Sequence, residues 1–227
     1  MRSLLFFLII AVTSSIQAQK KFTVVIDAGH GGSNKGAISG EIEEKELTLE
    51  LALKLKAFFD KHGSENIHAV FTRTNDTELP VKNRIELIER IKPDLFISLH
   101  FNSQKFLSTN RGFEVYYPAD VINEKSVETA QKYDRANRSF IYGSIFKEMF
   151  FKANLHTTWK LPFNLFTQKY DLMMFDDTTA PGLLLEIAYL TSPEDRACIE
   201  NPDFVADIAW YIYDSVVKIT EKSRRGK

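Results

Sequence analysis

The most informative part of the sequence is Phe22-Thr23-Val24-Val25-Ile26-Asp27-Ala28-Gly29-His30-Gly31-Gly32. Its β-branched first half favours a strand that is covered on both faces of a sheet. The glycines that follow allow the backbone to turn sharply and leave His30 uncrowded. Because ligands of open α/β sheets bind beyond the carboxyl ends of the strands, we expect His30 to lie at a ligand site.

Two later segments also place chemically active side chains on apolar runs. The run Asp94-Leu95-Phe96-Ile97-Ser98-Leu99-His100 ends on a histidine, and Glu186 stands inside the run Leu183-Leu184-Leu185-Glu186-Ile187. Burying an ionised carboxylate among such neighbours is costly unless a partner or a metal ion compensates its charge. The three segments together suggest a metal site.

The predicted elements alternate between strand and helix after the first strand. Further strands are predicted over residues 67–72, 95–100, 112–117, 172–175 and 183–187. Helices are predicted over residues 47–62, 81–91, 139–152 and 202–220, from apolar residues that recur at helical spacing. The β-α-β-α-β beginning predicts a single α/β domain with a mostly parallel central sheet, flanked by helices on both faces.

Several features have an ordinary structural explanation. The aromatic and aliphatic side chains of residues 139–152 lie at helical spacing, which favours packing in the core over a binding groove. Cys198 is expected to be a small buried residue, and a single cysteine cannot form an internal disulfide. The polar residues 123–137 are compatible with either a helix or a loop.

The two ends of the chain carry their own signals. In residues 1–18, Arg2 provides a positive end, residues 4–12 an apolar core and Ala18 a small residue, as in a secretory signal peptide. The apolar run is shorter than the roughly 20 residues of a spanning helix, so we expect export to the periplasm or cell envelope rather than a stable membrane anchor. Residues 19–222 then form one domain of ordinary size. Residues 223–227 form a basic flexible tail, solvated or touching an anionic envelope surface.

Composition narrows the classes of function. Hydrophobic residues make up 44% and charged residues 26% of the chain, as in a globular protein. With Lys+Arg 29 against Asp+Glu 30, no excess of positive charge supports a nucleic-acid partner.

The candidate residues can be interpreted as a catalytic metal centre or in simpler ways. Two imidazoles and a carboxylate form a known ligand set for catalytic zinc, which activates a water molecule while a second carboxylate accepts its proton. Taken alone, His30 or His100 is more simply explained as a hydrogen-bonded or surface histidine. Glu44 taken alone is explained as an acidic residue at the positive end of the following helix. The residues by themselves are therefore compatible with a metal hydrolase and also with ordinary structural roles for each side chain.

Seven blocks of sequence follow one another in a characteristic order: Ile26-Asp27-Ala28-Gly29-His30-Gly31-Gly32 with Gly36-Ala37, Glu44-Lys45-Glu46-Leu47-Thr48-Leu49, Thr72-Arg73, Asn83-Arg84, Ser98-Leu99-His100-Phe101-Asn102, Gly112-Phe113-Glu114-Val115-Tyr116-Tyr117, and Leu185-Glu186-Ile187-Ala188-Tyr189-Leu190-Thr191-Ser192. With these blocks, nearly all of the predicted mature chain resembles the zinc-dependent N-acetylmuramoyl-L-alanine amidases of the type-3 amidase family. The resemblance implies that His30, Glu44 and His100 bind zinc and that Glu186 is the catalytic carboxylate. Asn102 matches a family asparagine close to the metal and is expected to contact the substrate.

The resemblance implies zinc-dependent hydrolysis of the amide bond between the lactyl group of N-acetylmuramic acid and L-alanine in peptidoglycan. Such an enzyme would serve cell-wall remodelling or daughter-cell separation, with peptidoglycan or its fragments as its partner. Whether it also requires a protein activator stays open at this point. Two alternatives stay open. One is a non-catalytic or weakly active peptidoglycan-binding protein on the same fold, and the other is a metal-free anion site at His30-Gly31-Gly32.

The sequence departs from the family pattern at three positions. Asn34 stands where aspartate is usual, Phe101 where alanine is usual and Ala188 where glycine is usual. We expect these changes to alter substrate preference rather than zinc binding. Some members also carry an inserted helix whose carboxylate covers the zinc ion. Residues 123–137 occupy a comparable place, either as a solvated segment or as a weak autoinhibitor.

Overall fold

The computed structural model describes residues 20–63, 65–104, 110–118, 127–167 and 173–225. The predicted signal peptide, residues 1–18, lies outside the described part of the chain, so its cleavage stays a prediction. None of the helices in the described ranges combines the length and the apolar character that a membrane span requires.

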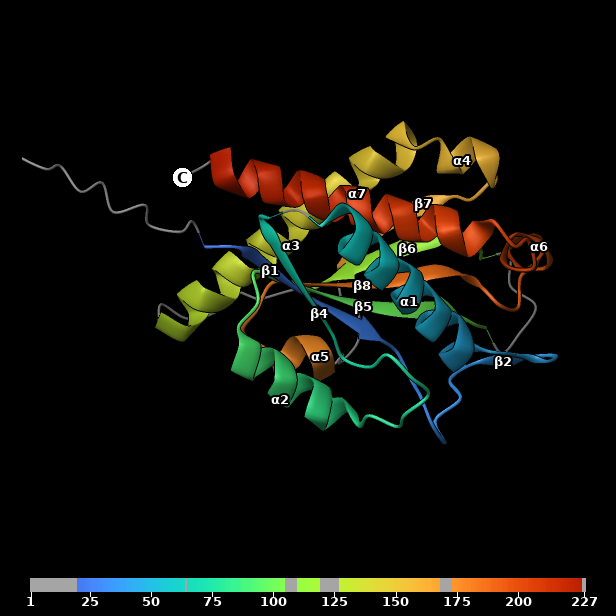
Figure 1. Ribbon diagram of the computed structural model, residues 1–227, viewed down its shortest axis with the longest axis horizontal. Helices are drawn as coiled ribbons and strands as arrows, with labels where there is room; N and C mark the ends of the chain where they lie inside the picture. Colours follow the sequence, from blue (N-terminus) through green and yellow to red (C-terminus); the bar gives the residue numbers. More distant parts are fainter. Residues whose placement is uncertain (1–19, 64, 105–109, 119–126, 168–172, 226–227) are drawn as a thin grey trace, which may run out of the picture.

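A six-stranded sheet forms the centre of the molecule (Figure 1). In spatial order its strands are β4 (Ile67–Phe71), β1 (Phe22–Ala28), β5 (Leu95–Asn102), β8 (Gly182–Tyr189), β6 (Phe113–Tyr117) and β7 (Phe163–Thr167). Strands β4, β1, β5 and β8 are parallel, β6 runs antiparallel to β8, and β7 is parallel to β6. The prediction of a mostly parallel sheet is confirmed.

Helices cover both faces of the sheet, as predicted (Figure 1). The first face carries α1 (Glu44–His62), α3 (Val127–Lys152) and α7 (Phe204–Arg225), and the second face carries α2 (Val81–Ile91) and α5 (Met173–Asp176). The other described elements are the short helices α4 (Leu155–Thr158) and α6 (Pro193–Ile199) and a hairpin of β2 (Ile38–Ser39) and β3 (Ile42–Glu43). Because α7 continues to residue 225, the first three residues of the predicted tail are helical.

Strand β1 packs against a core on each face of the sheet. Val24 and Ile26 belong to the larger core beneath α1 and α7, whereas Val25 belongs to the smaller core beneath α2. All three side chains are fully buried. Burial of an aliphatic side chain of this size contributes about 1.5–3 kcal/mol, so this strand is firmly fixed where its end leads into the glycine turn.

Most predictions about single buried residues are confirmed. Cys198 is buried, and so are four apolar side chains of the predicted helix over residues 139–152, namely Ile145, Phe146, Met149 and Phe150. Phe140 differs from them because 46% of its surface is exposed. Its ring contacts Tyr117 at the edge of the core, with 5.5 Å between the ring centroids.

The structure corrects the elements in the second half of the chain. The predicted strand over residues 172–175 is wrong, because residues 173–176 form α5, while residue 172 lies outside the described ranges. Phe175 is buried against Phe96 on the second face, and periodicity cannot separate such a buried helical turn from a short strand. Strand β7 was not predicted. Helix α3 begins at residue 127, so the described part of residues 123–137 is helical.

Candidate metal centre

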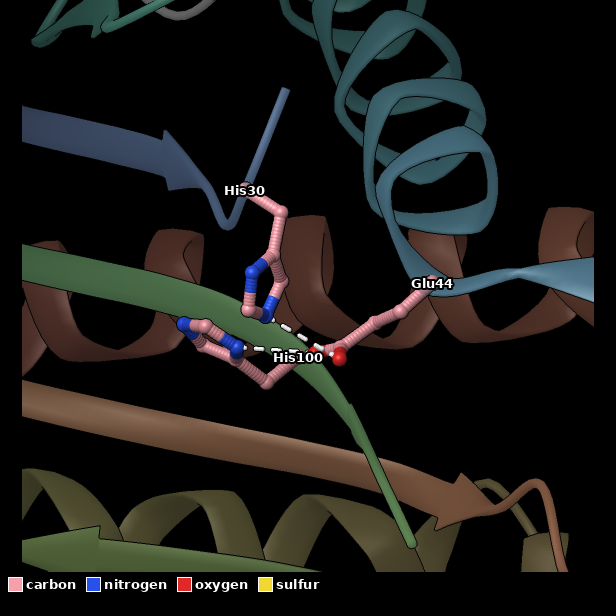
Figure 2. A group of neighbouring side chains, drawn as sticks. All are labelled: His30, Glu44 and His100. Atoms are coloured by element: carbon pink, nitrogen blue, oxygen red, sulfur yellow. Dashed lines mark hydrogen bonds and ion pairs between the residues drawn. The ribbon is translucent and has the colours of Figure 1, made fainter. Parts of the chain in front are cut away.

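Three side chains from separate elements meet at the carboxyl end of the sheet. His30 lies in the turn after β1, Glu44 is the first residue of α1, and His100 lies near the end of β5 (Figure 2). His30 Nε2 is 3.0 Å from Glu44 Oε2, and His100 Nδ1 is 2.9 Å from Glu44 Oε1. One ligand atom from each residue lies within 4.8 Å of the other two. The strand ends therefore converge as expected, and the group has the composition of a metal site.

Glu44 occupies the middle of this group. Its buried carboxylate accepts hydrogen bonds from the backbone N–H groups of Ala37 at 2.8 Å and Phe101 at 3.1 Å. Burial alone would raise the pKa of Glu44, but the hydrogen bonds and charges of His100 and His30 outweigh burial and hold the pKa well below its usual range. Burial also opposes protonation of His100, yet the Glu44 carboxylate raises the pKa of that imidazole. Glu44 starts α1 and also belongs to the metal-site group, so its place at the positive end of the helix does not exclude a role as a metal ligand.

The turn that carries His30 is ordered by Asn34. His30 has a φ of 60°, in the left-handed region that residues other than glycine rarely adopt. Its Nδ1 donates to Asn34 Oδ1 at 2.9 Å, and Asn34 Oδ1 also accepts the N–H of Gly36 at 3.2 Å. With the proton on Nδ1, the lone pair of Nε2 faces Glu44. The amide that replaces the usual aspartate therefore still orients the imidazole.

Two glycines allow the three side chains to approach one another. A Cβ atom on Gly29 would lie 2.4 Å from Cε1 of His100, and one on Gly36 would lie 2.5 Å from Glu44 Oε2. Gly36 also has a φ of +68°. A larger residue at either position would displace a member of the group.

Glu186 faces the same region from the neighbouring strand β8. It is paired in register with His100 of β5 and with Glu114 of β6. Among the described residues, its Oε2 atom is buried without a hydrogen-bond partner. Burial raises the pKa of Glu186 to about 7, and the charges of Glu44 and Glu114 act in the same direction against the opposing effect of His100. The expected burial of this carboxylate among apolar neighbours is confirmed for its Oε2 atom, while its role as the catalytic carboxylate stays a prediction.

The metal-site group and Glu186 line one cavity of about 600 Å³. Apolar parts of its wall come from Val81, Met174 and Leu184, and Asn102 lies beside Glu186. A second cavity of about 450 Å³ shares Asn102, Leu184 and Glu186 with the first and continues past them. Both volumes fall in the range of about 300–1,000 Å³ that is usual for small-molecule sites. Glu186 thus lies where two parts of an extended substrate could meet.

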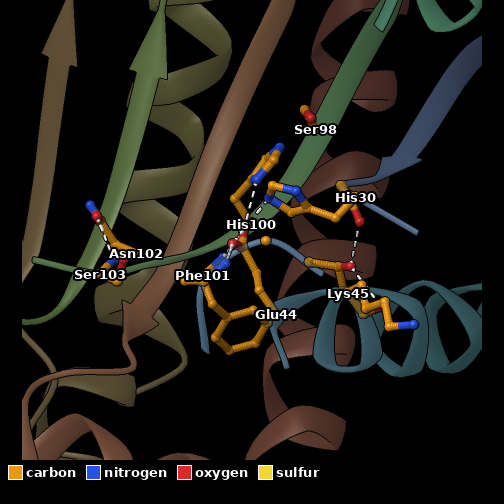
Figure 3. Close-up of polar contacts among 12 residues, drawn as sticks. His30, Glu44, Lys45, Ser98, His100, Phe101, Asn102 and Ser103 are labelled. Carbon is orange, nitrogen blue, oxygen red and sulfur yellow. Dashed lines mark hydrogen bonds and ion pairs between the residues drawn. The ribbon is translucent and has the colours of Figure 1, made fainter. Parts of the chain in front are cut away.

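Asn102 is held in place by a residue that the sequence analysis missed. Its Nδ2 donates to Glu114 Oε2 at 3.2 Å. Its Oδ1 accepts the N–H of Ser103 at 2.8 Å (Figure 3). Glu114 is buried and also accepts the hydroxyl groups of Tyr116 at 2.8 Å and Tyr189 at 2.9 Å. A carboxylate inside an otherwise apolar strand was the signal that could have identified it.

The other two departures from the family pattern are mainly buried. Phe101 has 2% of its surface exposed, and its ring packs in the larger core, although it also borders the first cavity (Figure 3). Ala188 is fully buried in the same core. Their bulk therefore lies mostly in the core.

The segment considered as an autoinhibitor is only partly described. Its Asp134 is exposed and lies 3.9 Å from Arg138 one helical turn away. The side chains of Glu124 and Glu128 lie outside the described part of the structure. Autoinhibition by residues 123–137 therefore stays a hypothesis.

Comparison with known proteins gives a consistent set of relatives. The sequence profile of a family described as N-acetylmuramoyl-L-alanine amidase matches residues 24–218. The germination-specific N-acetylmuramoyl-L-alanine amidase of Bacillus subtilis is 25% identical over 88% of this chain and 80% of its own length. The probable cell wall amidase LytH of Staphylococcus epidermidis is 30% identical over 79% of this chain, which spans 52% of that relative. The catalytic domain of CwlV, an amidase from Bacillus (Paenibacillus) polymyxa var. colistinus, is 28% identical, with a TM-score of 0.69 over 89% of this chain and 99% of that domain.

Proposed function

The chain belongs to the N-acetylmuramoyl-L-alanine amidases, which hydrolyse peptidoglycan, and we propose that it does so with a zinc ion bound by His30, Glu44 and His100. The bond cleaved is the amide between the lactyl group of N-acetylmuramic acid and L-alanine. The observation that carries this proposal is the approach of three ligand atoms to within 4.8 Å, beside a buried carboxylate oxygen without a partner.

The donor set fits zinc. Two imidazole nitrogens and one carboxylate oxygen are ligands that catalytic zinc sites use, and they leave a coordination position for water or substrate. Held by His30, Glu44 and His100, a zinc ion would supply a water molecule of lowered pKa and would polarise the carbonyl oxygen of the scissile amide. Asn34 keeps His30 in the tautomer that offers Nε2, and the backbone N–H groups of Ala37 and Phe101 orient the Glu44 carboxylate.

Glu186 is proposed as the general base and acid. Its Oε2 atom has no competing hydrogen bond among the described residues and borders the cavity that the three ligands also line. There it can accept the proton of the attacking water and deliver it to the nitrogen of L-alanine as the amide bond breaks. Burial and the charges of Glu44 and Glu114 raise the pKa of this carboxyl group, which favours its holding the proton between the two transfers.

Asn102 is proposed to bind the substrate. Its side chain is fixed at both ends, through Glu114 and the N–H of Ser103, which leaves one amide hydrogen for a ligand. A fixed donor beside Glu186 suits an acceptor on the substrate, such as a carbonyl oxygen near the scissile bond.

We place the activity outside the cytoplasm, on the cell wall or its fragments, with residues 1–18 removed as a signal peptide. Cell-wall remodelling, daughter-cell separation and a protein activator remain parts of this proposal. The alternative of a weakly active wall-binding protein was based on added bulk at Phe101 and Ala188. Because both residues are largely buried, that alternative loses its main support.

The test combines metal analysis with hydrolysis. Purified protein, residues 19–227, should bind one zinc ion per chain by elemental analysis after gel filtration, and His100→Ala should bind much less. The zinc-loaded protein should reduce the turbidity of purified peptidoglycan, a chelator should stop the reaction, and added zinc should restore it. Hydrolysis that persists in the metal-free protein would refute the zinc mechanism.

A further inference from the structure

Two buried arginines lie behind the turn that carries His30. Arg84 belongs to α2 and has 4% of its surface exposed, and Arg73 follows β4 with 5% exposed. Fully buried arginines are rare unless their charge and donors are satisfied. In the sequence, both residues belong to the blocks that carry the family resemblance, and neither has a predicted role.

Arg84 binds the turn from the side of the second face. Its Nη2 donates to the carbonyl oxygen of His30 at 2.6 Å, and its Nη1 donates to the carbonyl oxygen of Ala28 at 2.6 Å. The same guanidinium donates to Asp27 Oδ1 at 2.5 Å and to the carbonyl oxygen of Leu79 at 2.8 Å. One planar group thus joins β1, the His30 turn and the start of α2.

Arg73 joins the same turn to α1. Its Nε donates to the carbonyl oxygen of Ala28 at 3.0 Å, and its Nη2 donates to those of Gly29 and Lys45, both at 2.8 Å. Lys45 directly follows Glu44 in the chain. Arg73 therefore fixes the backbone beside two of the three proposed ligands in a single set of hydrogen bonds.

The conformation of the turn explains why these donors are needed. His30 adopts the left-handed conformation, and the carbonyl oxygens of Ala28, Gly29 and His30 all accept hydrogen bonds from the two arginines. Buried carbonyl groups need donors, and a guanidinium supplies five in a fixed fork, whereas lysine supplies a compact point charge.

The charge of Arg84 is paired with a carboxylate away from the ligands. Asp27 has 1% of its surface exposed and accepts hydrogen bonds from Arg84, from the hydroxyl of Thr72 at 2.7 Å and from the hydroxyl of Ser98 at 2.8 Å. Asp27 is therefore the direct partner of Arg84, and the charges of Asp76 and Asp27 also act on Arg73. Glu44 pairs with the two imidazoles.

We propose that Arg84 and Arg73 are positioning residues of the metal centre. They hold His30 in its left-handed conformation, with Nε2 directed at Glu44, and thereby set the zinc affinity without touching the metal or the substrate. This inference rests on the proposed zinc site.

Arg84→Lys tests the inference, because it keeps the positive charge and removes the fork. Zinc affinity is measured by competition with a chromophoric chelator, and the site geometry by the visible spectrum of the cobalt(II)-substituted protein. Replacing residues that orient metal ligands typically costs about 10- to 100-fold in affinity, so we expect a loss in that range together with a changed cobalt spectrum. Arg73→Lys should act in the same direction and provides a second variant if Arg84→Lys does not fold.

Arg135→Lys is the matched control. Arg135 is also a buried arginine, and its Nη1 donates to the carbonyl oxygens of Phe175 at 2.6 Å and of Thr178. We expect Arg135→Lys to lower thermal stability but to keep zinc affinity within about twofold, since its hydrogen bonds to Phe175 and Thr178 lie outside the His30 turn.

Three results would overturn the inference. One is wild-type zinc affinity and an unchanged cobalt spectrum in folded Arg84→Lys and Arg73→Lys, and another is an equal loss of affinity in Arg135→Lys. The third is that the wild-type protein binds neither zinc nor cobalt(II). This result would refute the proposed zinc site, and the positioning role would fall with it.

Discussion

Replacing Glu186 with glutamine should stabilise the metal-free protein at high pH. Burial raises the pKa of this carboxyl group from its ordinary 4.5 to about 7 in the folded protein. One pKa unit corresponds to about 1.4 kcal/mol, so this difference in pKa corresponds to about 3 kcal/mol. The charged form of Glu186 therefore carries a penalty that glutamine, which does not ionise, avoids.

The sign of the pH dependence follows from the raised pKa. The folded state keeps the proton to a higher pH than the unfolded chain does, so the stabilising contribution is fully present below pH 4.5 and is lost as the pH rises through about 7. The free energy of unfolding of Glu186→Gln, minus that of the wild type, should therefore grow by about 3 kcal/mol between about pH 4.5 and about pH 8. For a domain of this size, that difference shifts the melting temperature by roughly 6–12 °C.

Urea denaturation of both proteins in the presence of a chelator, at the two pH values, measures this difference. Glu46→Gln, a change at an exposed position of α1, serves as the control and should shift stability by less than about 0.5 kcal/mol at either pH. Added zinc should shrink the Glu186→Gln effect, because a nearby cation favours the ionised carboxylate. A difference that stays constant from acid to alkaline pH would show that Glu186 ionises without penalty and would refute this explanation.

Three further predictions concern the metal centre. Gly36→Ala should abolish zinc binding without unfolding the protein, because its Cβ would lie 2.5 Å from Glu44 Oε2; elemental analysis and circular dichroism check this. Asn34→Ala should weaken zinc binding about 10-fold or more in chelator competition, whereas Asn34→Asp should not, because only alanine removes the acceptor for Nδ1 of His30. Zinc affinity should fall as the pH drops through the pKa of His100, which Glu44 raises above 6.5, because a protonated imidazole cannot bind the metal; zinc titrations across pH measure the change, and a flat profile would contradict it.

The outline of the fold and the site could be predicted because they follow from local patterns. Apolar β-branched runs between amphipathic helices indicate parallel strands, and parallel strands bring His30 and His100 to the same edge of the sheet. The apolar neighbours of Glu186 likewise predicted a buried carboxylate, which the unpartnered Oε2 atom confirms. The role of Glu44 depended on the family resemblance, because an acidic residue at the start of a helix has an ordinary explanation.

Other features could not be predicted because they depend on contacts between distant parts of the chain. Arg84 and Asp27 are 57 positions apart, and no pattern around either residue indicates that they form a buried ion pair. The short strand β7 and helix α5 carry too few residues for periodicity to separate helix from strand. Glu114 was overlooked for another reason, since its strand carries the same signal that identified Glu186.

The most direct test of the central claim identifies the bond that the protein cleaves. Zinc-loaded protein, residues 19–227, is incubated with purified peptidoglycan fragments, and the released peptides are analysed by mass spectrometry beside Glu186→Gln and a chelated sample. We expect free peptides that begin with the amino group of L-alanine, lost in the chelated sample and reduced by several orders of magnitude in Glu186→Gln. Intact fragments despite bound zinc, or cleavage that Glu186→Gln leaves unchanged, would contradict the proposed mechanism.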